Sequence, residues 1–404
     1  MKNNIELSTI ERSIFDSILH CLEKGETIVA GSEFELYLPN GLKKLNWPHR
    51  TYVDIKYRLI YDSIDKIRYE FDNSDANKLV VVVIAENDLE YKIFRAGNSL
   101  SGRNIDFYLY DELICKLSSK RSTHKVTEEE IDLYNKSKDS SVLSKAKNAI
   151  IDNKVSLFLG AGVSASAGVV TWDSLLERLL KKKGLPPIKS DVDGITKGRY
   201  IIDAYKKQND IIPDEFFKDM RTILYSDTHP SELIDSIAYL ISKGNVESVI
   251  SYNYDDLVEQ KVKKYKRCYS VYDKSRPNNS NSINIYHVHG FIPKFGPWSP
   301  IVLGEKEYHK VYQEAYNWGN VEQLHSLCRN VCLFIGLSMR DPNLRRLIDI
   351  SNDGGEIERV HYAFLRKGDY DVPFMEENMR GFGVNCIWYD NHDDLPRMIR
   401  DLLQ

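Results

Sequence analysis

The sequence lacks the cysteine pattern of a disulfide-stabilised or zinc-binding protein. Its 404 residues include six cysteines that form no C-x-x-C pair: Cys21, Cys115, Cys268, Cys328, Cys332 and Cys386. Neither a disulfide framework nor a four-cysteine zinc site is therefore expected. Scattered free thiols are typical of a reducing compartment, so we expect a cytoplasmic protein.

The sequence also lacks long apolar runs and a strong net charge. No run approaches the ~20 apolar residues that a membrane-spanning helix needs, and the first residues, MKNNIELSTIERS, contain no apolar signal core. A formal net charge of −4 gives no basis for wholesale binding to nucleic acid or to membranes. We therefore expect no membrane partner.

Three segments differ in composition, and the length predicts two or three domains. Residues 1–120 alternate helical and strand patterns, as in a small α/β domain. Residues 121–141 are polar and rich in Lys, Ser and Glu, which predicts a linker. Residues 142–404 alternate short apolar runs with amphipathic helical patterns, which predicts a larger α/β domain with a parallel sheet.

Acidic and basic side chains follow two predicted strands of the first segment. Glu33 and Glu35 alternate with apolar residues, and Asp54 and Lys56 lie on a later strand. The order of elements resembles the core of restriction-endonuclease-like nucleases. The resemblance implies that Glu33 or Glu35 and Asp54 hold Mg²⁺, with Lys56 as the catalytic lysine beside phosphate.

Two other interpretations of this first segment remain open. The charged residues could lie on a solvated strand face without any ligand. The domain could also have the shape of a nuclease without its catalysis and serve assembly or DNA contact.

A glycine-rich turn follows the first predicted strand of the long segment. The apolar run 155–159 is followed by Gly160, Gly162 and Gly168, and then by leucines at helical spacing. Such a turn lets backbone N–H groups approach a phosphate. The third glycine comes too late for the G-x-G-x-x-G dinucleotide fingerprint, so a tight turn without a ligand is the alternative.

Three later predicted strands also end in polar residues. Asn253 and Asp255 follow one strand, His289 lies in the segment HVHG, and Gly336 and Ser338 follow the last. Ligands of open α/β sheets bind at this carboxyl edge. An amide and a carboxylate there could instead cap a helix, and a histidine there could be structural or could act as a base.

Together, the segments GAGVSASAG, YNYD, HVHG and GLS resemble the sirtuin signature in order and spacing. More closely, they are similar to bacterial sirtuin-like effector domains. The resemblance implies a Rossmann-like parallel sheet with a nicotinamide-dinucleotide site. It also implies that four residues of the first segment hold the pyrophosphate: Gly160, Ala161, Gly162 and Ser164.

The resemblance assigns further roles by position. Asn253 and Asp255 correspond to residues beside the nicotinamide ribose, and His289 corresponds to the catalytic histidine. Gly336 and Ser338 correspond to the loop on the adenosine side. Trp172 matches an aromatic residue that is typical of the effector branch.

Departures from the deacylase pattern favour hydrolysis over deacylation. Trp172 lies within the segment where deacylases have D-F-R, Tyr252 replaces a glutamine, and the zinc module is absent. We therefore expect NAD⁺ to be the substrate, cleaved to nicotinamide and ADP-ribose. Asn253 would orient water or the nicotinamide amide, and His289 would contact the ribose hydroxyls and accept a proton.

The effector branch consists of toxic antiphage proteins that deplete NAD⁺ in abortive infection. The resemblance therefore implies a homo-oligomer gated by a partner, such as a HerA-type DNA-translocating ATPase, with DNA as a further partner. Two alternatives remain: a subunit that senses NAD⁺ or ADP-ribose without cleaving it, and a metal-dependent DNA nuclease with the sirtuin-like half as its scaffold.

Overall fold

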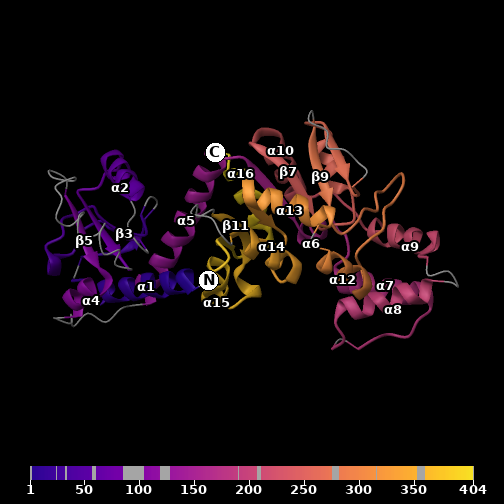
Figure 1. The fold of residues 1–404 in the computed structure, drawn as a ribbon, viewed down its shortest axis with the longest axis horizontal. Coiled ribbons are helices and arrows are strands. Elements are labelled where there is room, and N and C mark those ends of the chain that lie inside the picture. Colours follow the sequence, from indigo (N-terminus) through magenta and orange to yellow (C-terminus); the bar gives the residue numbers. More distant parts are fainter. Residues whose placement is uncertain are drawn as a thin grey trace. The chain divides into compact units, whose positions relative to one another are not determined.

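The computed structural model describes residues 2–23, 25–31, 34–56, 61–84, 104–118, 128–189, 191–206, 211–274, 282–314, 316–352 and 360–403. The chain divides into two compact units, Met1–Lys145 and Ala146–Gln404, drawn from indigo through magenta to yellow in Figure 1. Helix α5 (Glu128–Asp152) occupies residues 128–141 of the segment 121–141 that the sequence predicts to be a linker. Residues 121–127 lie outside the described part.

The first unit is built on a five-stranded sheet of order β1-β2-β3-β4-β5. β1 to β3 pair antiparallel and β3 to β5 pair parallel. The strands are β1 (Val29–Ala30), β2 (Leu36–Leu38), β3 (Thr51–Lys56), β4 (Lys78–Val83) and β5 (Ile105–Leu109). The α-helices are α1 (Lys2–Leu19), α2 (Tyr61–Asn73) and α4 (Tyr110–Ser118), and η1 (Lys43–Leu45) is a 3₁₀ turn.

Helices cover both faces of this sheet, because alternate residues of its strands point to opposite sides. Val53 and Val80 pack with α1 and α4 on one face. Tyr52 and Leu79 pack on the other face with Ile67 of α2. Burial on both faces explains the continuous apolar run of β4. A strand predicted at Tyr91–Phe94 lies outside the described residues.

The second unit contains a seven-stranded sheet of order β12-β11-β10-β6-β7-β9-β8, and its neighbouring strands are all parallel. The strands are β6 (Val155–Leu159), β7 (Val246–Ser251), β8 (Cys268–Val271), β9 (Ile283–His287), β10 (Val331–Ile335), β11 (His361–Arg366) and β12 (Val384–Tyr389). The Rossmann-like parallel sheet predicted for this part of the chain is confirmed.

The helices of the second unit fall into three main groups, two of which pack against the sheet. The first, α13 (Trp318–Arg329), α14 (Pro342–Asn352) and α15 (Val372–Arg380), packs with Phe158 and Phe334 in one core cluster. The second pairs α10 (Glu232–Lys243), which also contacts β7, with α16 (Leu395–Asp401). The third, α7 (Trp172–Lys183), α8 (Gly194–Tyr205) and α9 (Asp214–Leu224), has a core of its own. The remaining helices are α6 (Ala161–Ala165), α11 (Leu257–Val262) and α12 (Glu305–Gln313), with 3₁₀ turns η2 (Lys367–Asp369) and η3 (His392–Asp394).

The strand order places the four motif-bearing loops together. β10, β6, β7 and β9 are adjacent in the sheet, so the loops that leave their carboxyl ends meet at one edge. Two of these loops touch through glycines: a Cβ on Gly162 would lie 2.9 Å from the Cα of Gly336, and Gly336 has a φ of +67°. Among the described helices, none is both long enough and apolar enough to cross a membrane.

Candidate active site

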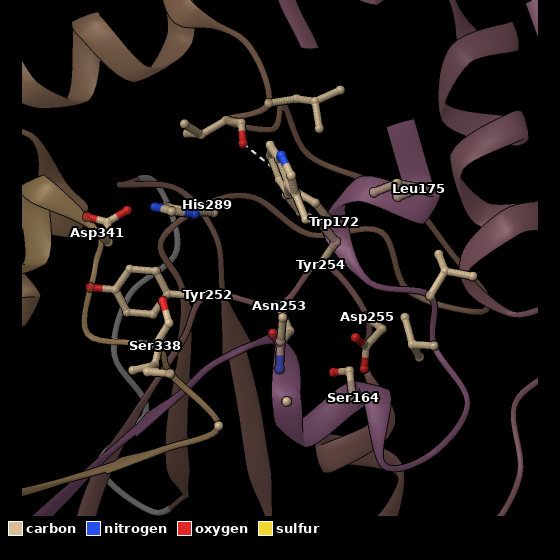
Figure 2. Close-up of a pocket in the computed structure, with 18 of the residues that line it drawn as sticks. Ser164, Trp172, Leu175, Tyr252, Asn253, Tyr254, Asp255, His289, Ser338 and Asp341 are labelled. Atoms are coloured by element: carbon tan, nitrogen blue, oxygen red, sulfur yellow. Dashed lines mark hydrogen bonds between the residues drawn. The ribbon is translucent and has the colours of Figure 1, made fainter. Parts of the chain in front are cut away.

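A cavity of about 640 Å³ opens at this carboxyl edge, and all four loops contribute to its wall (Figure 2). Its volume lies within the ~300–1,000 Å³ usual for ligand pockets. Nine of the ten residues that the sequence predicts for the NAD⁺ site line it: Ala161, Gly162, Ser164, Trp172, Asn253, Asp255, His289, Gly336 and Ser338. The tenth, Gly160, contributes a carbonyl that holds one of the others in place.

Asn253 is fixed at the end of β7 by hydrogen bonds on three of its atoms. Its side-chain Nδ2 donates to the carbonyl of Gly160 at 2.9 Å. Its backbone N–H donates to Ser251 Oγ at 3.2 Å, and its carbonyl lies 3.0 Å from Nδ1 of His287. These bonds tie the loop after β7 to the loop after β6, so the amide has one orientation toward the cavity.

His289 lies against Tyr252 and faces Asp341. The two rings meet edge to face with centroids 4.8 Å apart, and Figure 2 shows the Asp341 carboxylate on the nitrogen side of the imidazole. Burial lowers the pKa of His289, and Asp341 offsets part of that fall. The imidazole is therefore neutral near pH 7, which is the form that can accept a proton.

Asp255 both accepts a hydrogen bond from the start of a helix and lines the cavity. Its Oδ1 accepts the backbone N–H of Leu257 at 3.1 Å, at the start of α11. Its side chain lies beside Ser164 (Figure 2). Burial raises the pKa of Asp255, and the Ser164 hydroxyl offsets part of that rise. The N-cap position of α11 belongs to Asp256, so Asp255 is not the cap considered from the sequence, although it accepts the N–H of the first helical residue.

Trp172 opens α7 and closes the apolar side of the cavity. Its ring lies 6.3 Å from that of Tyr254, which also lines the cavity. A Cβ on Gly194, the first residue of α8, would lie 2.4 Å from Trp172 Nε1. The first turn of α8 thus packs directly against Trp172, which α7 contributes to the cavity wall.

The structure adds two polar residues that the sequence did not single out. Tyr308 of α12 donates from its hydroxyl to Asp341 Oδ1 at 3.2 Å, and both residues line the cavity. Asp341 stands five residues after Gly336, in the loop between β10 and α14, and this place in a motif-bearing loop was a usable signal. Tyr308 carries no such signal, because only the packing of α12 brings it to this edge.

The first unit gathers its predicted residues as well. Lys56 Nζ lies 2.9 Å from Asp54 Oδ1, and Glu35 Oε2 accepts the backbone N–H of Ile55 at 2.9 Å. Burial and the neighbouring Asp54 raise the pKa of Glu35 to about 7. Burial alone would lower the pKa of Lys56, but Asp54 and Glu35 raise it above its usual value. Glu33 lies outside the described residues.

One atom of this carboxylate cluster (Glu35, Asp54 and Lys56) lacks a partner. Asp54 is 1% exposed, and its Oδ2 has no hydrogen-bond partner within the described part of the chain. No group of three or more His, Cys, Asp or Glu side chains there is arranged to hold a metal ion. Two carboxylates with an unsatisfied oxygen nevertheless fit Mg²⁺, which is usually held by one or two carboxylates with water and phosphate.

The fold and the cavity define a Rossmann-like α/β domain with a ligand-sized pocket at the carboxyl edge of its sheet, and part of this domain is similar to a known family. Residues 247–386, which include Asn253, Asp255, His289, Gly336 and Ser338, match the model of the SIR2-like domain. The match therefore covers three of the four loops at the cavity.

Curated relatives come from several bacteria. The NAD(+) hydrolase ThsA of Enterococcus faecium is 28% identical over 245 residues, which are 57% of this chain and 47% of that protein. The protein of the same name from Bacillus cereus is 22% identical over 275 residues, 62% of this chain and 54% of its own. The chain thus spans about half the length of the curated relatives it matches.

Solved structures with a similar chain trace include Sir2 proteins. One, from work on the mechanism and regulation of Sir2 enzymes, is 14% identical with a TM-score of 0.36, covering 64% of this chain and 97% of its own. Another, a mutant Sir2 homologue with ADP-ribose, is 15% identical with a TM-score of 0.38, covering 64% and 95%.

Proposed function

We propose that the second unit is an NAD⁺ glycohydrolase that cleaves NAD⁺ to nicotinamide and ADP-ribose. The observation that carries the proposal is the meeting of Asn253 and His289 in the wall of one cavity beside the glycine loop. The similarity to proteins named NAD(+) hydrolase supports it.

The reaction suits these two side chains. The nicotinamide ring is cationic in NAD⁺ and becomes neutral when its bond to the ribose breaks. It is therefore a good leaving group, and the site needs no strong general acid. Because Asn253 Nδ2 donates to Gly160, its Oδ1 is the atom left to accept a hydrogen bond from water or from the nicotinamide amide. The neutral imidazole of His289 would bind the ribose hydroxyls and accept a proton as water adds to the oxocarbenium-like ribose.

The other lining residues would bind the rest of the dinucleotide. Gly160, Ala161, Gly162 and Ser164 would hold the pyrophosphate at the turn where β6 gives way to α6. Glycine is needed at positions 160 and 162 because a Cβ at either would collide with the loop after β10. Asp255 would face the nicotinamide ribose, and Gly336 and Ser338 the adenosine. Trp172 would cover the apolar side.

Two assays on the purified full chain test this proposal against its alternatives. Etheno-NAD⁺ should gain fluorescence as nicotinamide is released. Binding of NAD⁺ or ADP-ribose without turnover would favour a sensing subunit instead. Cleavage of plasmid DNA with Mg²⁺ or Mn²⁺, in the absence of etheno-NAD⁺ turnover, would favour the nuclease.

A second candidate function concerns the first unit, and it is favoured by Asp54 Oδ2, which has no hydrogen-bond partner among the residues that the structure describes. Glu35 and Asp54 would hold Mg²⁺, and Lys56 would neutralise the charge of a phosphate placed between them. The cation would supply Lewis acidity toward a phosphodiester. Metal-dependent cleavage of DNA that is lost in Asp54→Asn and retained in His289→Ala would support this function.

Control of the activity is part of the proposal. An NADase of an antiphage effector must be restrained before infection, so we propose a homo-oligomer gated by a partner such as a HerA-type ATPase. The resemblance of the four motifs to effector domains supports this idea. NAD⁺ turnover measured with and without a purified ATPase of this type tests it, and equal turnover would count against gating.

A further inference from the structure

We infer that His287 is a positioning residue, which holds the Asn253 peptide from behind the cavity while Glu259 holds the imidazole in turn. This inference rests on the proposed NAD⁺ cleavage. His287 is the first histidine of HVHG, two residues before His289, and the cavity does not reach it.

The contacts of His287 are short and fully buried. Its Nδ1 lies 3.0 Å from the carbonyl oxygen of Asn253, and its Nε2 lies 2.5 Å from Glu259 Oε1. The side chains of His287 and Glu259 are 0% and 1% exposed. Glu259 is fixed in addition by the hydroxyl of Ser270, which donates to the same Oε1 at 3.1 Å.

The partners dictate where the protons lie. A carbonyl oxygen only accepts, so Nδ1 must carry the hydrogen that points to Asn253. A second proton must lie between Nε2 and Glu259, since an imidazole lone pair facing a carboxylate at 2.5 Å would be repulsive. Burial alone would lower the pKa of His287, but Glu259, the Asn253 carbonyl and Asp255 raise it overall.

This arrangement connects three elements to one peptide. β9 supplies His287, α11 supplies Glu259, and the loop after β7 supplies Asn253. On the cavity side, Asn253 Nδ2 is held by Gly160. Asn253 is therefore held at two points, its backbone carbonyl by His287 and its side-chain amide by Gly160. Loss of the His287 contact would let the backbone shift and the side-chain amide turn away from Gly160.

A purely structural ion pair is the competing explanation. Buried pairs often add little net stability relative to apolar residues of the same volume. A structural pair would affect the melting temperature of the protein and leave the kcat of the folded enzyme unchanged. A positioning pair would lower kcat, because a misplacement of about 1 Å can cost on the order of 10²-fold.

Two double variants separate these explanations. His287→Asn/Glu259→Gln keeps a donor at the place of Nδ1, whereas His287→Gln/Glu259→Gln keeps a donor only toward position 259. Both remove the same buried charges. His361→Asn is the matched control, because His361 is also 0% exposed but stands at the start of β11 and does not line the cavity.

We expect the kcat for nicotinamide release to be about 10- to 100-fold lower in His287→Gln/Glu259→Gln than in His287→Asn/Glu259→Gln, with little change in KM. His361→Asn should lower the melting temperature and keep kcat. Equal kcat values in the two folded double variants would overturn the inference. If the glutamine variant does not fold, His287→Leu/Glu259→Met, which also lacks the donor but fills the space, takes its place.

Crystal structures of the same variants test the positioning role of His287 whether or not the protein cleaves NAD⁺. The Asn253 Nδ2 to Gly160 contact should be lost in His287→Gln/Glu259→Gln and kept in its partner variant. Should the wild type release no nicotinamide, the proposed function fails, while these structures still decide the positioning role. An unchanged contact in both would refute it.

Discussion

The cavity of the second unit and the carboxylate cluster of the first both bury polar side chains, yet Asn253 and Asp54 are held differently. In the cavity, Asn253 has protein partners on three atoms. In the cluster, Asp54 Oδ2 has none among the described residues. Protein atoms thus orient the Asn253 amide, whereas the Asp54 carboxylate keeps an oxygen that a cation, water or the protonated carboxyl of Glu35 can contact.

The two regions also differ in how burial acts on charge. Burial holds His289 neutral near pH 7, ready to accept a proton. In the cluster, burial and Asp54 raise the pKa of Glu35 to about 7, so its carboxyl is half protonated at that pH. The cavity should therefore become active as pH rises above the lowered pKa of His289, and the cluster should bind cations better as pH rises through about 7.

The largest expected effect is loss of NAD⁺ cleavage in His289→Ala and Asn253→Ala. A missing general base typically costs 10²–10⁴-fold, so kcat for nicotinamide release should fall by about that factor in His289→Ala. Metal binding by the first unit should not change. His392→Ala, an exposed histidine of the same unit, is the control. Wild-type turnover in both cavity variants would remove these roles.

The next effect concerns the glycine contact between two loops of the cavity. Gly336 and Gly184 have φ values of +67° and +70°, so alanine strains the backbone similarly at both. A Cβ at Gly336 would also lie 2.6 Å from the N of Val163, whereas at Gly184 nothing lies within 4 Å.

Gly336→Ala should therefore destabilise the protein by about 1–3 kcal/mol more than Gly184→Ala and should raise KM for NAD⁺. Chemical denaturation and steady-state kinetics measure the two effects. If both variants unfold at the same denaturant concentration, the close packing of the two loops contributes nothing to the free energy of unfolding.

In the first unit, Asp54→Asn should weaken Mn²⁺ binding at least about tenfold, since a hard cation prefers a charged oxygen ligand. Binding by the wild type should strengthen as pH rises toward about 7 and level off above it, because Glu35 must lose its proton first. Calorimetry on the full chain at several pH values measures both.

Without a bound metal, the raised pKa of Glu35 makes the free energy of unfolding depend on pH. Folding favours the protonated form of Glu35, so the stabilisation present below its ordinary pKa of 4.5 is lost as pH rises through about 7. Mn²⁺ should then raise the melting temperature more at pH 8 than at pH 6. A cation effect that is independent of pH would argue against Glu35 as a ligand.

The smallest effect is a shift of the pH profile in Asp341→Asn. Asp341 raises the pKa of His289, so removing its charge should move the acidic limb of kcat/KM to lower pH. Asparagine can still accept the N–H of Leu344 that Asp341 accepts at 2.8 Å. Asp371→Asn is the control, because Asp371 caps α15 through Phe374 and lies outside the cavity wall. Identical profiles for the three proteins would show that Asp341 does not act on His289.

Sequence patterns predicted the sheet of the second unit and the meeting of its four loops. The reason is physical: each of the strands ending at 159, 251 and 335 is a short buried run, followed by a glycine or a polar residue. Parallel pairing then brings those ends to one edge. The carboxylate cluster was predicted from alternation and a D-x-K spacing on one strand, although two acids remained candidates.

Other features had no local signal. Strand β8 (Cys268–Val271) is short and half-buried at the edge of the sheet, so no apolar run marks it. His287 looked like part of a strand, because only the packing of α11 brings Glu259 to its Nε2. The start of α5 did have a signal, since a short helical pattern is visible near Glu128–Tyr134, but the polar composition around it favoured a linker.

A crystal structure of the chain with ADP-ribose would show whether the four loops form one NAD⁺ site. The pyrophosphate should lie against Gly160 to Ser164, with the anomeric carbon of the terminal ribose between the Asn253 amide and the His289 imidazole. A ligand bound elsewhere, or one whose terminal ribose points away from both side chains, would contradict this arrangement.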